Sequence, residues 1–319
     1  MIYTHIDYIF AHTSFVMLLI VTLPNPINSF QKVDRLNHFS KNGITIAFFR
    51  STGSLAIRYF QTKHLPLGNL YESLMFLSWS FSLVFLISNI GNQNNLSGAV
   101  LAPSATLTHA FATSSLPQNM QKSNVLVPAL QSHWLMTHVS TTTISYAILL
   151  CGSSLAIVLL SLFYGKVSTY YTVNLESNSK YMKQKCSSNY CNNIQKQTNL
   201  KSFLYLLFSN SRKCQLVNYL DKWAYQAISL GFSFLTIGIL SGAVWANEAW
   251  GSYWNWDPKE TWALVTWLVY AIYLHTRIEG KWMGEGPAMA ASMGFFLVWI
   301  CFLGVNLLGV GLHSYGWLV

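Results

Sequence analysis

Seven long apolar segments constrain this chain more than any other feature of its sequence. About 20 mainly apolar residues are needed to cross the hydrocarbon core of a bilayer. Within lipid the backbone must satisfy its own hydrogen bonds, and a single segment does so only as a helix. No alternating strand pattern is present, so a β-barrel is not expected. The segments are 8–23, 43–60, 67–90, 134–164, 223–247, 261–276 and 287–312.

The composition favours the same class of protein. Only 9% of the residues are charged and 52% are hydrophobic, whereas a soluble domain carries about 25% charged residues. We therefore predict an all-α, polytopic membrane helix bundle with about seven transmembrane helices. The net charge of +9 does not indicate a nucleic-acid partner, because nine of the 19 Lys and Arg lie in residues 165–222. Membrane lipid is the expected surrounding.

Three parts follow along the chain. Residues 1–90 are predicted to form three transmembrane helices, and residues 91–133 a loop. Residues 134–319 are predicted to form a core of four transmembrane helices. An insert at about 165–222, rich in Asn, Ser, Lys and Gln, interrupts this core, and we expect it to be solvated and mostly without a core of its own.

The Lys and Arg positions predict the orientation in the membrane. With seven spans, one side holds the N-terminus, the insert and 13 basic residues, Arg58 among them. The other side holds five, and Arg50 within the second segment is the remaining one. The side with 13 is expected to be cytosolic or stromal. The far side then holds residues 91–133, 246–260 and the C-terminal tail.

Residues 246–260, which we call the Trp loop, belong to a stretch that is unusually rich in tryptophan. Six of the 12 Trp lie in residues 245–267. An aromatic belt at the membrane interface explains one or two Trp at a helix end, but not four Trp and a Tyr between two helices. The alternative is a flat aromatic platform for a large planar ligand. Asp257, Pro258 and Glu260 fit the N-cap, N1 and N3 positions of a helix, which would hold the platform rigid.

Three of the nine His lie near the ends of apolar segments, namely His138, His275 and His313. Ionisable groups at membrane depth are costly and are commonly functional. In the predicted topology His138 and His313 share a side with the Trp loop, and two His beside an aromatic platform suit axial ligation of a haem iron. A lone His is more often interfacial or a packing residue. His133, five residues before His138, is the nearest rival as a ligand.

Trp250-Gly-x-x-Trp254-x-Trp256-Asp257-Pro258-Lys259-Glu260 resembles the WWD signature of haem-handling membrane proteins. The surrounding sequence resembles the CcsA family of cytochrome c biogenesis proteins, which belong to the two-component (System II) haem-attachment system. The resemblance extends over about 60–90 and 130–319, without the insert. Further matching stretches are 65–74, 231–250 and 273–277.

The resemblance implies a function at the haem-attachment step of c-type cytochrome biogenesis. The chain would move haem across or within the membrane and present it to the CxxCH thiols of apocytochromes, as a subunit of a cytochrome c haem lyase. A haem transporter or chaperone without synthase activity is one alternative, and a non-haem scaffold with the Trp loop as an interface is another. Thiol addition to the haem vinyl groups needs mainly positioning and ligation from the protein.

The family's residue roles carry over to matching positions. His138 and His313 match the pair that coordinates haem beneath the WWD loop and are assigned to the attachment reaction. His275 matches the His that binds haem inside the membrane together with a His of a partner. The ligand so implied is b-type haem. Its implied contacts are the iron ligands His138, His275 and His313 and the loop residues Trp250, Gly251, Trp254, Trp256 and Asp257.

The implied partners are a CcsB/ResB-like membrane protein, which supplies the second intramembrane His, and apocytochromes c such as cytochrome f and soluble c-type cytochromes. A hydrophobic chain of this family with an Asn- and Lys-rich insert is typical of plastid-encoded members. We therefore expect a multi-pass protein of the chloroplast thylakoid membrane with the Trp loop facing the lumen. A cyanobacterial thylakoid or plasma membrane is the alternative.

Overall fold

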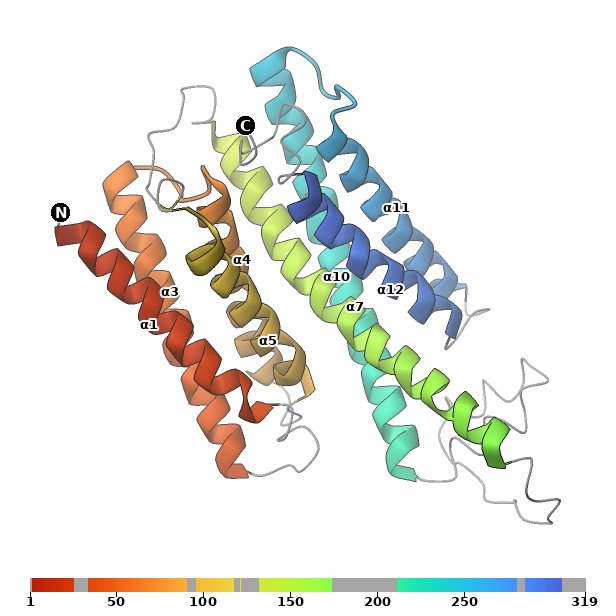
Figure 1. Ribbon diagram of the computed structural model, residues 1–319. Helices are drawn as coiled ribbons and strands as arrows, with labels where there is room; N and C mark the ends of the chain where they lie inside the picture. The colour runs from red at the N-terminus through yellow and green to blue at the C-terminus, as the bar shows by residue number, and fades with distance from the viewer. Residues whose placement is uncertain are drawn as a thin grey trace.

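A computed structural model describes residues 2–25, 34–90, 96–117, 121, 132–173, 211–279 and 285–305. Within these ranges the chain is all-helical and has no strands, which confirms the predicted class. Figure 1 shows the helices running up and down along a common direction. They are α1 (Ile2–Thr22), α3 (Asp34–Thr62), α4 (Leu70–Ile90), α5 (Leu96–Ala110), α7 (His133–Val173), α10 (Ser211–Trp250), α11 (Pro258–Ile278) and α12 (Glu285–Trp299), with π-helical turns η1 (Phe111–Ser115) and η3 (Ile300–Gly304).

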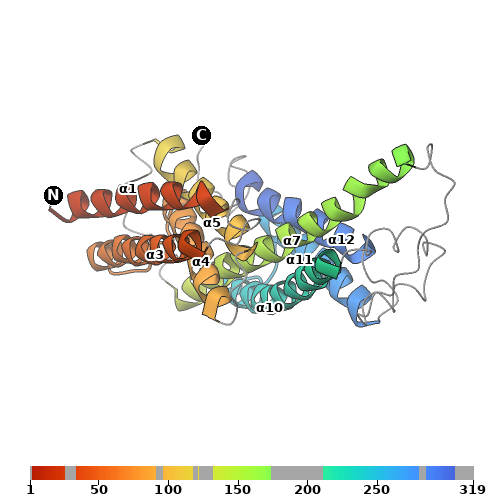
Figure 2. The ribbon, with the colours of Figure 1, turned by 90° about the horizontal axis from the view of Figure 1, so that it is seen from below.

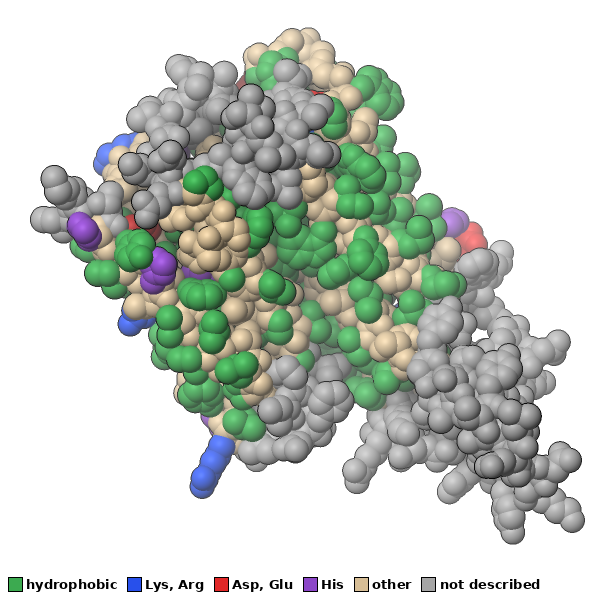
Figure 3. Space-filling model, in the orientation of Figure 1, with side chains coloured by type: hydrophobic (Ala, Val, Ile, Leu, Met, Phe, Trp, Pro, Cys, Tyr) green, Lys and Arg blue, Asp and Glu red, His purple; other side chains and the backbone are tan. Residues whose placement is uncertain are grey.

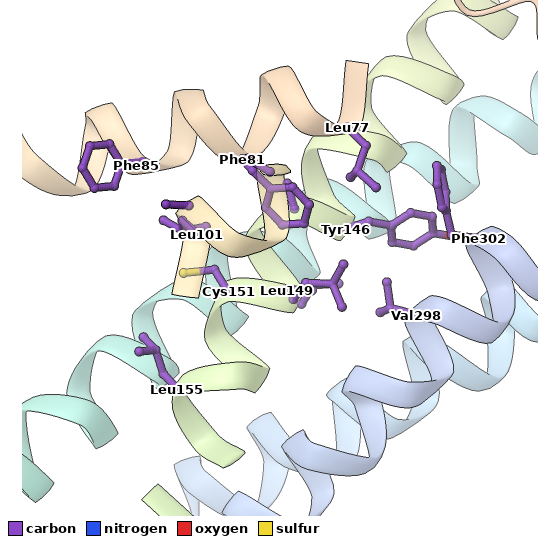
Figure 4. Packing of buried hydrophobic residues seen from close by; sticks show 14 of the residues in the cluster. Leu77, Phe81, Phe85, Leu101, Tyr146, Leu149, Cys151, Leu155, Val298 and Phe302 are labelled. Atoms are coloured by element: carbon purple, nitrogen blue, oxygen red, sulfur yellow. The ribbon is translucent and has the colours of Figure 1, made fainter. Parts of the chain in front are cut away.

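The helices form two groups that lie side by side in both ribbon views (Figures 1 and 2). The first group is α1, α3, α4 and α5, and the second is α7, α10, α11 and α12. α4 and α5 of the first group pack against α7 of the second. Figure 4 shows this joint, where Leu77 and Phe81 of α4 and Leu101 of α5 lie close to Tyr146 and Leu149 of α7.

The surface of the bundle suits a lipid environment. Side chains on the face shown in Figure 3 are largely hydrophobic, and large apolar residues such as Phe49 (67% exposed) and Ile272 (55% exposed) point outward. By length and composition, five described helices can cross a membrane. Their spans are His5–Thr22, Leu70–Asn89, His133–Phe163, Leu216–Trp250 and Gly286–Gly304. α3 and α11 are not among these five. α3 packs along α1 and α11 packs along α12, so each runs beside a helix that can cross the membrane.

The structure differs from the sequence prediction at residues 91–133, where α5 and η1 replace part of the expected loop. α5 packs antiparallel to α4, and small residues permit the close approach. A Cβ added at Gly98 would lie 2.9 Å from Cε2 of Phe85. The hydroxyl of Ser78 on α4 donates to the carbonyl of Ala105 at 2.9 Å. α5 is only 15 residues long and contains Pro103, so it is shorter than the roughly 20 apolar residues of a membrane-spanning helix.

His109 near the end of α5 has a structural role. Its side chain is fully buried, and Nε2 lies 3.0 Å from the carbonyl oxygen of Ala11 and 3.2 Å from Oγ of Ser14. Its Nδ1 lies 3.4 Å from Oγ of Ser78. These contacts connect α1, α4 and α5 and satisfy both ring nitrogens, as a buried polar group requires.

The additional helix reverses the predicted orientation of the N-terminal helices. Because the helices alternate in direction, α1 now begins at the end of the bundle where α10 ends and α11 begins, here called the Trp-loop end. The opposite end, where α7 ends and α10 begins, is the insert end. By sequence, 14 basic residues belong to the insert end: three between positions 32 and 41, nine in 165–222 and two in 277–281. Four belong to the Trp-loop end, so the positive-inside asymmetry is larger than for seven spans.

The insert is shorter than predicted. α7 continues to Val173 and α10 begins at Ser211, so both flanks of 165–222 are helical. About three turns into α10, the carboxylate of Asp221 accepts a hydrogen bond from Nη2 of Arg277 on α11 at 2.7 Å. This buried pair joins α10 to the insert end of α11. Residues 174–210 lie outside the described part of the chain.

A buried ionic cluster joins α1, α3 and α4 at the Trp-loop end. The guanidinium of Arg58 lies 2.8 Å from Asp7 and 3.3 Å from Glu72, and all three side chains are at most 10% exposed. Arg58 also donates to the carbonyl of Gln121 at 2.9 Å. Glu72 accepts from the amide of Gly68 at 2.9 Å. The stretch 65–74 therefore starts α4 and supplies a carboxylate partner for Arg58.

The alternating directions of the described helices predict which sites are accessible from each face of the membrane. In a cysteine-free background, single cysteines at Thr4 and Ser252 are expected to react with an impermeant thiol reagent from the same face of sealed vesicles, and one at Ser187 from the opposite face. If α5 does not return the chain across the membrane, the Thr4 site labels together with Ser187.

Arg58 is expected to be essential for stability. Replacing it with Ala leaves Asp7 and Glu72 buried without their cation, which costs about 3–5 kcal/mol for a buried pair. Thermal unfolding of the purified protein in detergent measures the loss. Lys222→Ala, at an exposed position on α10, is the control and leaves the melting temperature unchanged. Equal melting temperatures for the two variants would contradict this assignment.

Candidate functional site

Close packing of α7 against α10 builds the candidate site. Glycines of α10 face α7 and leave no room for a side chain: a Cβ at Gly231 would lie 2.8 Å from Leu149, and one at Gly238 would lie 2.5 Å from Thr142. The hydroxyl of Ser145 donates to the carbonyl of Gly231 at 2.7 Å. Small residues commonly mediate close helix packing in membranes, where interhelical hydrogen bonds add stability.

His138 lies in this interface, one and a half turns into α7. Its Nδ1 is 2.6 Å from the carbonyl oxygen of Gly238 on α10, and its side chain is half-buried. A carbonyl only accepts hydrogen bonds, so Nδ1 is the protonated nitrogen. In the neutral ring Nε2 then carries the lone pair, and this is the tautomer that binds a metal through Nε2.

The Trp loop is held at both of its ends. Gly251, with φ of +76°, donates its amide to the carbonyl of Asn247 at 2.9 Å and ends α10. At the other end the predicted helix start is confirmed: Asp257 is the N-cap, Pro258 follows it, and Glu260 completes a capping box. Trp256, between these ends, has a φ of +57°, a left-handed conformation that is uncommon for a bulky residue.

The Trp rings do not form one flat platform, contrary to the sequence expectation. Trp245 and Trp250 pack edge to face with centroids 4.7 Å apart, and so do Trp254 and Trp256 at 6.1 Å. Edge-to-face packing is favoured by the ring quadrupoles. Trp245 is buried, whereas Trp256 is 72% exposed and Tyr253 is 62% exposed. The rings open to a ligand therefore lie in the second half of the loop.

His138 and the Trp loop lie at the same end of the bundle, as predicted. Ser132, directly before α7, donates to the carboxylate of Glu248 on the last turns of α10 at 3.0 Å. His138 is level with Gly238 and Gly242, which lie about two to three turns from the end of α10 at Trp250. The structure therefore brings one predicted ligand and the loop together.

His275 lies elsewhere, near the insert end of α11. Its side chain is 74% exposed and its Nε2 is 3.2 Å from a carboxylate oxygen of Glu279. Val265, Leu268 and Ile272 are also exposed and share its face at helical spacing. His275 therefore faces away from the other described helices, on an otherwise apolar stripe.

The remaining predicted iron ligand, His313, lies outside the described residues. His133, the rival candidate, is exposed at the first position of α7. Among the described residues no group of three His, Cys, Asp or Glu side chains is arranged to hold a bare metal ion. Ligation of a haem iron needs only one or two imidazoles, because the porphyrin supplies the other ligands.

Gly238 and Gly242 were not identified as site residues from the sequence. A Cβ at Gly242 would lie 2.5 Å from Nδ1 of His138, so this glycine makes room for the ring. The spacing Gly238-x-x-x-Gly242 is the small-residue pattern of close helix pairs and is the signal that identifies them.

Comparisons with known proteins give a consistent result. The family model described as Cytochrome C assembly protein matches residues 67–313. The chain is 69% identical to the cytochrome c biogenesis protein CcsA of Adiantum capillus-veneris, over the full length of both chains. It is 50% identical to that of Cycas taitungensis over the full length of both, and 52% identical to that of Marchantia polymorpha over 98% of each.

The role of Asp257 as a helix cap is testable. Asp257→Asn retains an acceptor for the backbone amide and is expected to keep the loop ordered, whereas Asp257→Ala loses about 1 kcal/mol of local stability. Amide hydrogen exchange of residues 251–261 measures the difference. If Asn and Ala accelerate exchange equally, the carboxylate has a role other than capping.

Proposed function

Because the chain belongs to the cytochrome c assembly protein family, we propose that it moves haem across or within the membrane and presents it to apocytochrome thiols at the Trp-loop end. Cytochrome c biogenesis is the process that the chain serves. The observation that carries the proposal is the hydrogen bond of His138 to the carbonyl of Gly238, which holds the imidazole in an iron-binding tautomer at the Trp-loop end of the bundle. A transporter or chaperone that hands haem to another synthase is the alternative.

Haem is the substrate in this proposal. Each thiol of a CxxCH motif adds across a vinyl group: a carbon–sulfur bond forms at one vinyl carbon, and the thiol proton goes to the other. No net oxidation occurs, so the protein contributes position and iron ligation. His138 and His313 are the proposed axial ligands, and Trp250, Gly251, Trp254, Trp256 and Asp257 form the loop above the haem.

Partly exposed aromatic rings support a role of the loop in holding haem. Tyr253 and Trp256 present large apolar faces outside the helix bundle, and burial of such faces against a porphyrin is favourable. The capping box and the helix end at Gly251 restrict the loop, so little conformational entropy is lost on binding.

The exposure of His275 supports a second haem site that is shared with a partner. An outward-facing imidazole on an apolar stripe is available to a neighbouring membrane protein. We propose that a CcsB/ResB-like subunit covers this stripe and supplies the second His. Haem then passes from this site to the one formed by His138 and His313 before attachment to apocytochromes such as cytochrome f.

The charge asymmetry supports a direction for this path. Fourteen basic residues belong to the insert end and four to the Trp-loop end, and the basic side is normally cytosolic or stromal. We propose a location in the chloroplast thylakoid membrane with the Trp loop in the lumen; in a cyanobacterial membrane the same orientation would place it on the lumenal or periplasmic side.

Replacing His138 or His313 with Gly is expected to abolish cytochrome maturation, because the iron loses an axial ligand. Added imidazole should enter the space left by the side chain and restore maturation. His275→Gly should instead reduce the amount of haem that co-purifies with the complex, since its role precedes attachment. Haem-stained c-type cytochromes and the absorption spectrum of the purified complex are the measurements.

His133→Ala is the matched control and is expected to mature cytochromes normally. If His138→Gly is silent while His133→Ala is defective, the ligand in α7 has been assigned to the wrong residue. Incubating the purified complex with an apocytochrome separates the two functions, because only a synthase forms thioether bonds there.

A further inference from the structure

We propose that Gly238 and Gly242 of α10 are positioning residues for His138. The carbonyl of Gly238 holds the ring through Nδ1, and the missing side chain at Gly242 lets the ring lie against α10. This inference rests on the proposed function, in which His138 binds iron. It concerns how the ligand is oriented and tuned rather than whether it binds.

The hydrogen bond to Gly238 fixes both the tautomer and the direction of the ring. Metal-binding His usually donate their second N–H to a carbonyl or carboxylate, which orients the ring and raises its basicity. Here the acceptor is a backbone carbonyl that also accepts from the hydroxyl of Ser241 at 2.9 Å. Every residue has a backbone carbonyl, so the residue type at position 238 does not supply this acceptor. His138 reaches the Gly238 carbonyl because α7 and α10 lie close together.

Gly242 sets that separation at the ring itself. A Cβ there would lie 2.5 Å from Nδ1, 2.6 Å from Cε1 and 3.1 Å from Cγ of His138, so three ring atoms face this one position. Any side chain would displace the ring from the Gly238 carbonyl. The imidazole would then lose its fixed tautomer and its fixed orientation against α10.

The other glycines of the interface have a different environment. A Cβ at Gly231 would meet Leu149, and one at Gly238 would meet Thr142 and Thr141. Gly231→Ala therefore disturbs the same helix pair by a similar overlap, at 2.8 Å, without touching the ring. It is the control for general damage to α7–α10 packing.

The experiment compares Gly242→Ala and Gly231→Ala in the complex with its membrane partner. Gly242→Ala is expected to lower cytochrome maturation by about 10–100-fold, the usual effect of removing a partner of a metal ligand. Its bound haem should show a changed axial-ligand spectrum and a shifted reduction potential. Gly231→Ala should lower the melting temperature, but the spectrum and potential of each bound haem should match the unsubstituted protein. Identical spectra for both variants, or a spectral change with Gly231→Ala, would overturn the inference.

A second comparison removes the ring. With imidazole present, His138→Gly/Gly242→Ala should mature less cytochrome than His138→Gly, because free imidazole takes the space of the ring and the added Cβ excludes it. His138→Gly/Gly231→Ala should mature as much as His138→Gly, since Gly231 faces Leu149 and not the ring. Equal rescue of the two double variants refutes the inference. If His138→Gly is itself silent without imidazole, the proposed function of His138 fails. If His138→Gly is defective and Gly242→Ala is silent, only the positioning role fails.

Discussion

The close approach of α7 and α10 is the constraint on which the rest of the structure depends. Lipid tails are as apolar as the side chains they surround, so helices in a membrane associate through packing and hydrogen bonds rather than through the hydrophobic effect. Gly152 of α7 and Gly231, Gly238 and Gly242 of α10 allow this approach. α12 then packs on α7 and α11 on α10, while α4 brings the N-terminal group to the opposite face of α7. An altered α7–α10 distance would therefore change how α11 and α12, which pack on these two helices and on each other, fit together.

The two ends of this helix pair have different chemistry. At the Trp-loop end a capped, conformationally restricted loop lies above a His whose tautomer is fixed by a backbone carbonyl. At the insert end His275 is exposed to the surroundings, and its partner Glu279 is on its own helix. His275 is 17 residues from the start of α11 at Pro258, or about 26 Å along a helix. In the proposed function these two sites are used in sequence, with the partner protein at the open one.

Local features of the site were predictable from the sequence, whereas its three-dimensional details were not. The Asp257–Pro258–Glu260 cap follows from residue types at fixed offsets, and the structure confirms it. The ring arrangement of the Trp loop depends on edge-to-face pairing between residues that sequence cannot orient, so the expected flat platform was wrong. Spacing places His275 on one face with Leu268 and Ile272, seven and three residues earlier, but only the structure shows that this face is exposed.

The fold, too, was predictable only in part, and α5 is the main element that the sequence prediction missed. Apolar segments predicted seven of the helices, but α5 is only 15 residues long, contains Pro103 and is rich in Ala, Ser and Thr, so it was not recognised as a membrane crossing. A different signal was available: the 49 residues between Glu72 and Lys122 contain no Asp, Glu, Lys or Arg, which is enough chain for two crossings of about 20 residues each. If the chain returns across the membrane through α5, α1 and α3 run in the opposite direction to the one predicted, and the segments that connect them change sides. This return moves three basic residues to the insert end and two to the Trp-loop end, so the division changes from 13 and five to 14 and four. The charge pattern and the helix packing are independent properties of the chain, and both favour a return of the chain through α5.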